Sequence, residues 1–293
     1  MAALQSHPRV DSDVSSWVTR LGIPGIFDIH VHFMPDAAQR AVWRHFDALG
    51  GWEIRYRTDE ATRLTTLQEL GVLRHTALAY AHKPDMAAWL NEYTLGLAER
   101  DNRTISTFTF YPEPSAGDYV RVALEQGGRV AKVHLQVGKF DPADPLLVSV
   151  WDRLESAGTV VVIHAGAVAD GSGGEAWCGM APVRRLLLAR PGLKLVLAHL
   201  GAPDYADAVA LAEEFPQLLM DTAMVLVEGT GFSYPPDLMA WLQASPRRIL
   251  FGSDFPSFPH DYAAQLRGLA ATGFGEAWLR RVLWHNAAEL LPG

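Results

Sequence analysis

Short apolar runs and longer amphipathic stretches alternate along the whole chain. Eight runs rich in β-branched residues have the length and the flanking turn residues of strands. They lie near 25–32, 72–80, 104–110, 130–136, 159–164, 193–199, 217–221 and 248–254. Between them, apolar residues recur every three or four positions, and Pro, Asp or Ser residues stand where helices would begin. This spacing predicts helices over 59–70, 84–100, 116–126, 145–157, 181–190, 204–215 and 235–244.

Eight strands alternating with helices in 293 residues predict an α/β fold with parallel strands and right-handed crossovers. Eight such units close a TIM barrel, (β/α)8. An open doubly wound sheet is disfavoured because a His-Val-His motif, and not a glycine-rich fingerprint, follows the first run. Residues 33–58 form a long first loop with a short helix near 36–49, which we expect to cover part of the site. Extra C-terminal helices, 260–271 and 276–290, close the chain. With no repeat or linker, one domain over 1–293 is expected.

Composition and charge narrow the class of protein. Hydrophobic residues make up 49% of the chain and charged residues 20%, which is typical of a globular enzyme. The net charge of -8 and the lack of a Lys/Arg cluster argue against nucleic-acid binding. The single cysteine excludes an intrachain disulfide and a thiolate zinc site. Residues 1–22 have neither a basic start nor an apolar stretch, so we expect no signal peptide, no membrane span and a cytoplasmic location.

Metal-binding residue types stand where the predicted strands end. His30 and His32 close the first run, His164 the fifth and Asp254 the eighth. Residues two apart in a strand point to the same face, so His30 and His32 can reach one ion over the barrel axis. Three imidazoles and one carboxylate suit zinc, manganese, iron or cobalt better than magnesium or calcium. His199, at the end of the sixth run, is predicted to polarise the substrate's carbonyl, because a catalytic metal keeps one position open. A supporting hydrogen-bond donor and a fourth imidazole ligand are the open alternatives for it.

The fourth run carries a buried lysine. Lys132 and His134 share its inner face with Gln136 by the period of two. Lys132 could be a carbamylated bridge between two metals, but we favour an ion pair with Asp28, because a buried lysine needs a counter-charge. His134 could touch the substrate or support a ligand.

Aromatic residues in the loops that follow the strands could wall a substrate pocket. Tyr80, Tyr111 and Trp177 are predicted to bind substrate, with ordinary loop packing as the alternative. Arg55, Arg57 or Arg184 could hold a substrate carboxylate, although arginines are mostly exposed and solvated.

A larger set of motifs carries a family resemblance: Asp28-Ile29-His30-Val31-His32, Lys132-Val133-His134, the strand ends at His164 and His199, Gly252-Ser253-Asp254-Phe255-Pro256, and Asn286-Ala287-Ala288. Together they resemble the amidohydrolase superfamily, and more narrowly the amidohydrolase-related branch that includes aminocarboxymuconate-semialdehyde decarboxylase and resorcylate decarboxylase. The resemblance spans about residues 25–291. It implies a distorted barrel, a homodimer and one divalent metal, most often zinc or manganese. It would make His30, His32, His164 and Asp254 the ligands, and His199 the histidine that activates water or substrate.

Three hypotheses for the activity follow. The first is hydrolysis of a small ester, lactone or amide, in which the bound metal, zinc being favoured, lowers the pKa of a water whose proton Asp254 takes while His199 stabilises the oxyanion. The second is non-oxidative decarboxylation of an aromatic or dienoic acid, with Asp254 or His199 managing the ring proton. The chain has no arginine that matches the decarboxylases' carboxylate-binding arginines at a motif position. The third is a metal-free lactonase or a non-catalytic binder of a small molecule.

Overall fold

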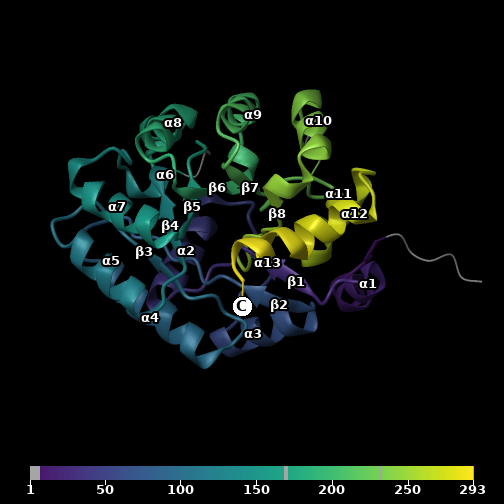
Figure 1. The fold of residues 1–293 in the computed structure, drawn as a ribbon. Helices are drawn as coiled ribbons and strands as arrows, with labels where there is room; N and C mark the ends of the chain where they lie inside the picture. Colours follow the sequence, from purple (N-terminus) through teal and green to yellow (C-terminus); the bar gives the residue numbers. More distant parts are fainter. Residues whose placement is uncertain (1–6, 168–170, 231–232, 293) are drawn as a thin grey trace, which may run out of the picture.

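A central set of parallel strands is surrounded by helices in the computed structural model, which describes residues 7–167, 171–230 and 233–292. The layers are visible in Figure 1, where helices lie outside the strands around most of the molecule. The strands are β1 (Ile26–Asp28), β2 (Val72–His75), β3 (Thr107–Thr109), β4 (Val130–His134), β5 (Val160–His164), β6 (Lys194–Leu197), β7 (Leu219–Asp221) and β8 (Ile249–Leu250).

Apart from α1, which precedes β1, the helices alternate with the strands as expected of a βα repeat, with two helices, α2 and α3, between β1 and β2. They are α1 (Val14–Leu21), α2 (Asp36–Leu49), α3 (Glu60–Glu69), α4 (Ala87–Arg100), α5 (Ala116–Glu125), α6 (Leu135–Gly138), α7 (Val148–Ala157), α8 (Met180–Ala189), α9 (Tyr205–Glu214), α10 (Pro236–Ala244), α11 (Tyr262–Ala271), α12 (Glu276–Arg280) and α13 (Asn286–Leu290). A turn of π-helix over Arg281–His285 joins α12 to α13, so the last predicted helix is one nearly continuous rod.

Each predicted strand contains a shorter observed strand, and the short helix predicted at 36–49 is confirmed as α2. β5 and β7 end where predicted, at His164 and Asp221, whereas the other six strands end before the predicted residue. β4 stops at His134, and Gln136 lies in the turn of α6, so the prediction that Gln136 shares a strand face with Lys132 is wrong. The period of two fails there because the backbone bends into a helix once the strand leaves its neighbours. The N-terminal helix α1 was not predicted.

The eight strands form two hydrogen-bonded sheets. β1 pairs with β2, and β3 to β8 pair in sequence order, all in parallel. The two sheets adjoin at two seams, one between β2 and β3 and one between β8 and β1. Each seam has an isolated bridge in place of a ladder of hydrogen bonds: His75 bridges to Thr104, and Val31 bridges to Phe255. At the second seam the amide of Asp254 donates to the carbonyl of His30 at 2.8 Å. The fold is therefore a (β/α)8 arrangement that is distorted at both seams, as predicted.

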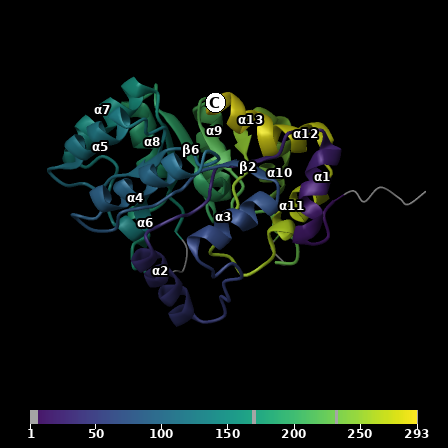
Figure 2. The same ribbon diagram turned by 90° about the horizontal axis from the view of Figure 1, so that it is seen from below.

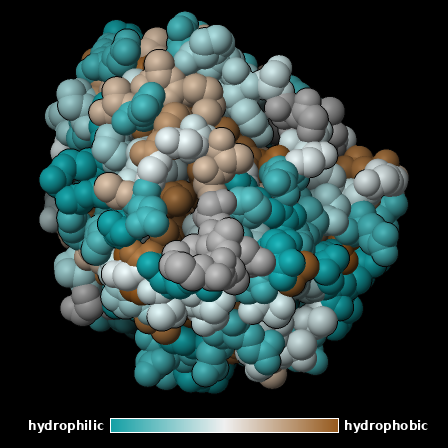
Figure 3. Space-filling model, turned by 90° about the vertical axis from the view of Figure 1, so that its right-hand side faces the viewer, coloured by the Kyte–Doolittle hydropathy of each residue, from teal (hydrophilic) through white to brown (hydrophobic). Residues whose placement is uncertain are grey.

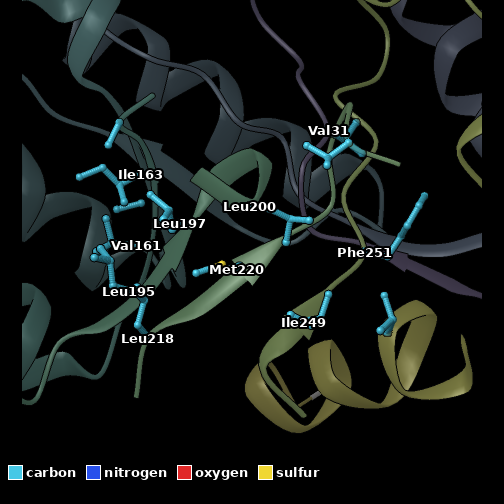
Figure 4. Close-up of a cluster of buried hydrophobic side chains, with 14 of the residues drawn as sticks. Val31, Val161, Ile163, Leu195, Leu197, Leu200, Leu218, Met220, Ile249 and Phe251 are labelled. Atoms are coloured by element: carbon cyan, nitrogen blue, oxygen red, sulfur yellow. The ribbon is translucent and has the colours of Figure 1, made fainter. Parts of the chain in front are cut away.

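The strands are buried on both faces, which is why they read as continuous apolar runs. On β5, Val161 and Ile163 pack outward against the helices, whereas Val160 and Val162 belong to the inner cluster. Figure 4 shows the outward cluster, with side chains of neighbouring strands meeting between sheet and helices. Burial of each such side chain stabilises the fold by about 1.5–3 kcal/mol.

Outside the core, the first connection stands apart from the barrel. In Figure 2, α2 projects beyond the other helices. On the side that carries α1, hydrophilic and hydrophobic residues are mixed in small groups (Figure 3). Within the described ranges, every helix is too short or too polar to cross a lipid bilayer.

Candidate metal centre

Side chains from six strand ends meet at the carboxyl edge of the strands, where barrel enzymes place their active sites. The first contact is between β1 and β8. The Nε2 atoms of His30 and His32 lie 3.4 and 2.8 Å from the same atom, Oδ1 of Asp254. The prediction that His30 and His32 point to one place is therefore confirmed.

Three of the imidazoles are anchored in the same way. Nδ1 of His30 lies 2.9 Å from Oδ2 of Asp221, Nδ1 of His32 lies 2.8 Å from the carbonyl of Leu78, and Nδ1 of His199 lies 2.9 Å from the carbonyl of Ala223. Each acceptor keeps a proton on Nδ1, which directs Nε2 into the cluster. Ligating histidines are oriented in this manner in metalloproteins.

The donor atoms fit a divalent transition metal. One ligand atom each from His30, His199 and Asp254 lies within 4.8 Å of the others, and His30 is fully buried. Two imidazoles and a carboxylate are donors that zinc and manganese accept. This group shares His30 and Asp254 with the predicted ligand set and includes His199, which we had predicted as a catalytic residue.

His164 lies beside this group. Its Nε2 lies 3.0 Å from the carbonyl of Gly166, so the unprotonated nitrogen is Nδ1. Its ring is 4.9 Å from that of His199 and stacks on His134 at 3.8 Å. Burial, followed by the charge of His134, holds the pKa of His164 well below its usual range, so the ring is neutral. Its role as a ligand stays a prediction.

Asp254 is ionised in this environment. Burial raises the pKa of its carboxyl, but the hydrogen bond and charge of His32, and then the charge of His30, outweigh burial and hold the pKa well below the usual range. Asp254 also has a left-handed backbone, with φ of 70°. Among the residues that the structure describes, seven non-glycine residues have a positive φ, and four of the others follow β6 or β7 at the same edge: His199, Leu200, Met224 and Leu226. Such strain concentrates at functional sites.

Lys132 does not pair with Asp28, so the predicted ion pair is wrong. Its Nζ donates to Nε2 of His30 at 3.2 Å, inside the cluster. Asp28 is occupied by other donors: the hydroxyl of Tyr262 at 2.8 Å and the amides of Ser253 and His30 at 3.0 and 3.2 Å. The carboxylate of Asp28 therefore accepts hydrogen bonds from residues near the C-terminal end of the chain, Ser253 and Tyr262, and a local sequence pattern does not reveal such partners. Burial raises the pKa of Asp28 to about 7 and lowers that of Lys132 to about 8.

His134 and Tyr80 border the cluster. The ring of Tyr80 is 5.7 Å from that of His32 and 5.1 Å from that of His134. The amide of Val137 donates to Nδ1 of His134 at 3.3 Å, which leaves the proton of the neutral ring on Nε2. Burial, followed by the charge of Lys132, keeps the pKa of His134 well below its usual range.

For two residues that were predicted to bind substrate, Tyr111 and Trp177, the structure gives other surroundings than the histidine cluster. Tyr111 packs against Phe140 at 5.7 Å and hydrogen-bonds through its backbone to the hydroxyl of Tyr119. Trp177 is 40% exposed in a short 3₁₀ turn, Glu175–Trp177. Their roles stay predictions. Arg57 and Arg184 form surface ion pairs with Asp47 and Glu214, as expected of solvated arginines.

Comparison with known proteins identifies the family. The model of the family described as "Amidohydrolase" matches residues 27–293. The chain belongs to the amidohydrolase family. It is therefore an enzyme of the superfamily that the motifs predicted, and a divalent metal is the family's usual cofactor.

Relatives of this amidohydrolase include decarboxylases. It is 27% identical over 311 residues to 6-methylsalicylic acid decarboxylase of Penicillium expansum, covering 90% of this chain and 95% of that one. A TIM-barrel protein of Bordetella bronchiseptica has a TM-score of 0.69 at 16% identity, covering 90% and 97% of the two chains. The 5-carboxyvanillate decarboxylase of Novosphingobium aromaticivorans, solved with manganese and a nitrobenzoic acid ligand, has a TM-score of 0.67 at 12% identity, covering 98% and 99%. The two structures support the barrel fold.

One residue of the amidohydrolase site was missed in the sequence. Asp221 closes β7 at the same edge, is fully buried and contacts both His30 and the backbone of His199. The signal was present, because Asp221 ends a predicted strand as Asp254 does. It was overlooked because no Gly or Pro directly follows its run, 217–221, and the run has no second ligand-type residue.

Proposed function

We propose that this enzyme is a metal-dependent, non-oxidative decarboxylase of a small phenolic carboxylic acid. The observation that carries the proposal is the position of Lys132, a buried cation whose hydrogen-bond partner is the neutral ring of His30. Sequence similarity along 90% of the chain to a decarboxylase of a methylated salicylic acid supports the same reaction class.

Charge balance favours an anionic substrate. With a divalent ion bound, two charges of the metal and one of Lys132 would face the carboxylates of Asp221 and Asp254. Asp28, whose pKa burial raises to about 7, adds at most one more negative charge. The sum is one positive charge while Asp28 is protonated, and this excess in a buried site would attract an anion strongly, because the interaction is little screened by water.

His30, His32, His164 and Asp254 would hold the metal, for which we propose zinc, and His199 would lie beside it. When bound, the metal would supply Lewis-acid polarisation of the substrate's carboxylate and adjacent hydroxyl oxygens.

The chain's own groups can then orient the acid and move the proton. His134 presents an Nε2–H donor whose tautomer is set by Val137, and we assign it to a substrate oxygen. Loss of carbon dioxide leaves the electron pair of the broken bond on the ring carbon, which needs a proton. Asp254, which is ionised, can take the proton of the adjacent hydroxyl and deliver it to that carbon, leaving a phenolate, while Nδ1–H of His199, held by the carbonyl of Ala223, orients the His199 ring.

Hydrolysis, the first prediction from the sequence, remains the second candidate. The observation that favours it is the ionisation of Asp254, because a carboxylate that is charged at neutral pH is suited to take a proton from water.

A substrate panel separates the two reactions. The purified, metal-loaded enzyme is incubated with hydroxybenzoic acids, with carbon dioxide release measured, and with esters and lactones of similar size. We expect carbon dioxide release from hydroxybenzoates that carry the hydroxyl beside the carboxylate. Turnover of esters or lactones without carbon dioxide release would replace the proposal with hydrolysis.

A substitution at Lys132 tests the charge argument. Lys132→Met should raise KM for a phenolic acid about tenfold, equivalent to ~1.4 kcal/mol of lost attraction. KM for a neutral ester substrate should not change. Lys139→Met is the matched control, because Lys139 is exposed. Equal KM values for the acid in the Lys132→Met variant and the wild type would show that Lys132 does not attract the substrate, and would contradict the proposal.

A further inference from the structure

Asp221 is the carboxylate that links the two sides of the cluster. It closes β7, and none of its surface is exposed. Both of its oxygens are used, and they face different elements. Oδ2 faces the ring of His30 after β1, and Oδ1 faces the backbone that follows β6 and β7.

The Oδ2 contact sets the tautomer of His30. Nδ1–H of His30 donates to Oδ2 at 2.9 Å, and both side chains are fully buried. Nε2 of the same ring therefore carries the lone pair, and it accepts a hydrogen bond from Lys132 at 3.2 Å. A ring in the other tautomer would direct a proton into the cluster and could not bind a metal through Nε2.

The Oδ1 contacts hold the turn that presents His199. Oδ1 accepts the amide of His199 at 3.0 Å and the amide of Ala223 at 3.1 Å. His199 has a left-handed backbone with φ of 57°, which costs a non-glycine residue energy and needs support. The carbonyl of Ala223 in turn accepts Nδ1–H of His199 at 2.9 Å. Backbone and ring of His199 are thus held from the same short segment after β7.

We propose that Asp221 is the positioning residue of this site: through one oxygen it fixes His30 as an Nε2 ligand, and through the other it fixes the turn that aims His199. The inference rests on the metal centre of the proposed function. It does not depend on whether the reaction is decarboxylation or hydrolysis.

An Asn at this position would separate the two contacts. The amide oxygen would stay with the two backbone N–H groups, because an NH2 group there would face two donors. The NH2 group would then face Nδ1 of His30 and donate to it, which moves the ring proton to Nε2. Asp221→Asn should therefore keep the fold and reverse the tautomer of His30.

The test compares Asp221→Asn with Asp101→Asn. Asp101 also faces a buried histidine, since Nε2 of His75 lies 3.2 Å from its Oδ2, but this pair lies at the β2–β3 seam. Each metal-free protein is titrated with Zn²⁺ against a competing chelator, and its melting temperature is measured. We expect the Kd for Zn²⁺ to rise 10- to 100-fold in Asp221→Asn and to stay within threefold of wild type in Asp101→Asn.

A direct measurement on the wild type does not require Asp221→Asn to fold. In ¹⁵N-histidine-labelled, metal-free wild type, the NMR signal that is missing from His30→Gln should show a neutral ring protonated on Nδ1. In Asp221→Asn the same signal should show protonation on Nε2.

Three results would overturn the proposal: an Nε2–H tautomer of His30 in the wild type, an unchanged Kd in a folded Asp221→Asn protein, or an equal loss of Zn²⁺ affinity in Asp101→Asn. A wild type that binds no Zn²⁺ would instead contradict the metal-dependent function, and the tautomer measurement would still report on Asp221.

Discussion

Two buried histidine–aspartate pairs stand in different parts of this barrel. His30 and Asp221 join β1 to β7 at the carboxyl edge, and His75 and Asp101 lie at the β2–β3 seam. Both histidines are fully buried. The pairs differ in what the second nitrogen of the ring faces. Nδ1 of His75 lies 3.0 Å from the carbonyl of Thr76, whereas Nε2 of His30 faces Lys132 and Asp254.

The surroundings of Asp101 and Asp221 also differ. Asp101 also accepts hydrogen bonds from Arg103 at 3.0 Å and from Thr104 at 2.8 Å, so its neighbours complete a closed ion-pair network. Around His30, by contrast, one ligand atom each from His30, His199 and Asp254 lies within 4.8 Å of the others, an arrangement that could hold a cation. A buried His–Asp pair is therefore evidence of function only when one ring nitrogen remains directed at other ligand-type groups.

Removal of the metal should affect the His30–Asp221 pair and the His75–Asp101 pair most differently. Chelation is expected to abolish turnover, which zinc or manganese should restore. It should also lower the melting temperature by about 5–10 °C, from ~2.7 kcal/mol of lost binding at a hundredfold excess over Kd. Hydrogen exchange should rise around His30 and stay unchanged around His75. Elemental analysis that finds no transition metal in active, chelator-free enzyme would favour a metal-free lactonase.

Substitution of Asp254 should come next. Asp254→Asn removes the carboxylate that faces His30 and His32, so kcat should fall 10²- to 10⁴-fold with the fold intact. Circular dichroism and steady-state kinetics check both statements. Asp101→Asn serves as the control and should keep its kcat at 25 °C. Undiminished turnover by a folded Asp254→Asn enzyme would show that Asp254 has no catalytic role.

Breaking the seam pair should affect stability alone. His75→Gln leaves Asp101 with fewer donors and should lower the free energy of unfolding by about 3 kcal/mol. Urea denaturation measures this loss. Zn²⁺ affinity and kcat should match wild type, and a loss of either would mean that the seam and the metal centre are coupled.

Acid should weaken the seam pair by the smallest amount. Burial raises the pKa of Asp101, but hydrogen bonds from His75, Thr104 and Arg103 outweigh it and hold the pKa below the ordinary 3.8. Asp101 thus contributes stability in full above pH 3.8, and this contribution is lost as the pH falls below that value. The difference in unfolding free energy between wild type and Asp101→Asn should shrink below pH 3.8. A difference that is constant down to pH 2 would contradict this ionisation.

Much of the fold and half of the site were predictable from the sequence, and the exceptions share a cause. His30 and His32 were placed correctly because the backbone after β1, which bridges to Phe255 at Val31, still alternates its side chains as a strand does. Lys132 was paired with the wrong partner, because the donors that occupy Asp28 come from Ser253 and Tyr262, more than 200 residues away. Gln136 was misplaced because a strand ends where its neighbours end, which a local pattern does not show.

The sequence by itself determined the repeating βα order, the buried strands and the residue types that end them, since these depend on local hydrophobic periodicity and turn chemistry. The tertiary structure decided which side chains meet, which tautomer each histidine adopts and which carboxylates are ionised. Those properties depend on distances of about 3 Å between residues remote in the chain, as with Asp221 and His30, and no local pattern specifies them.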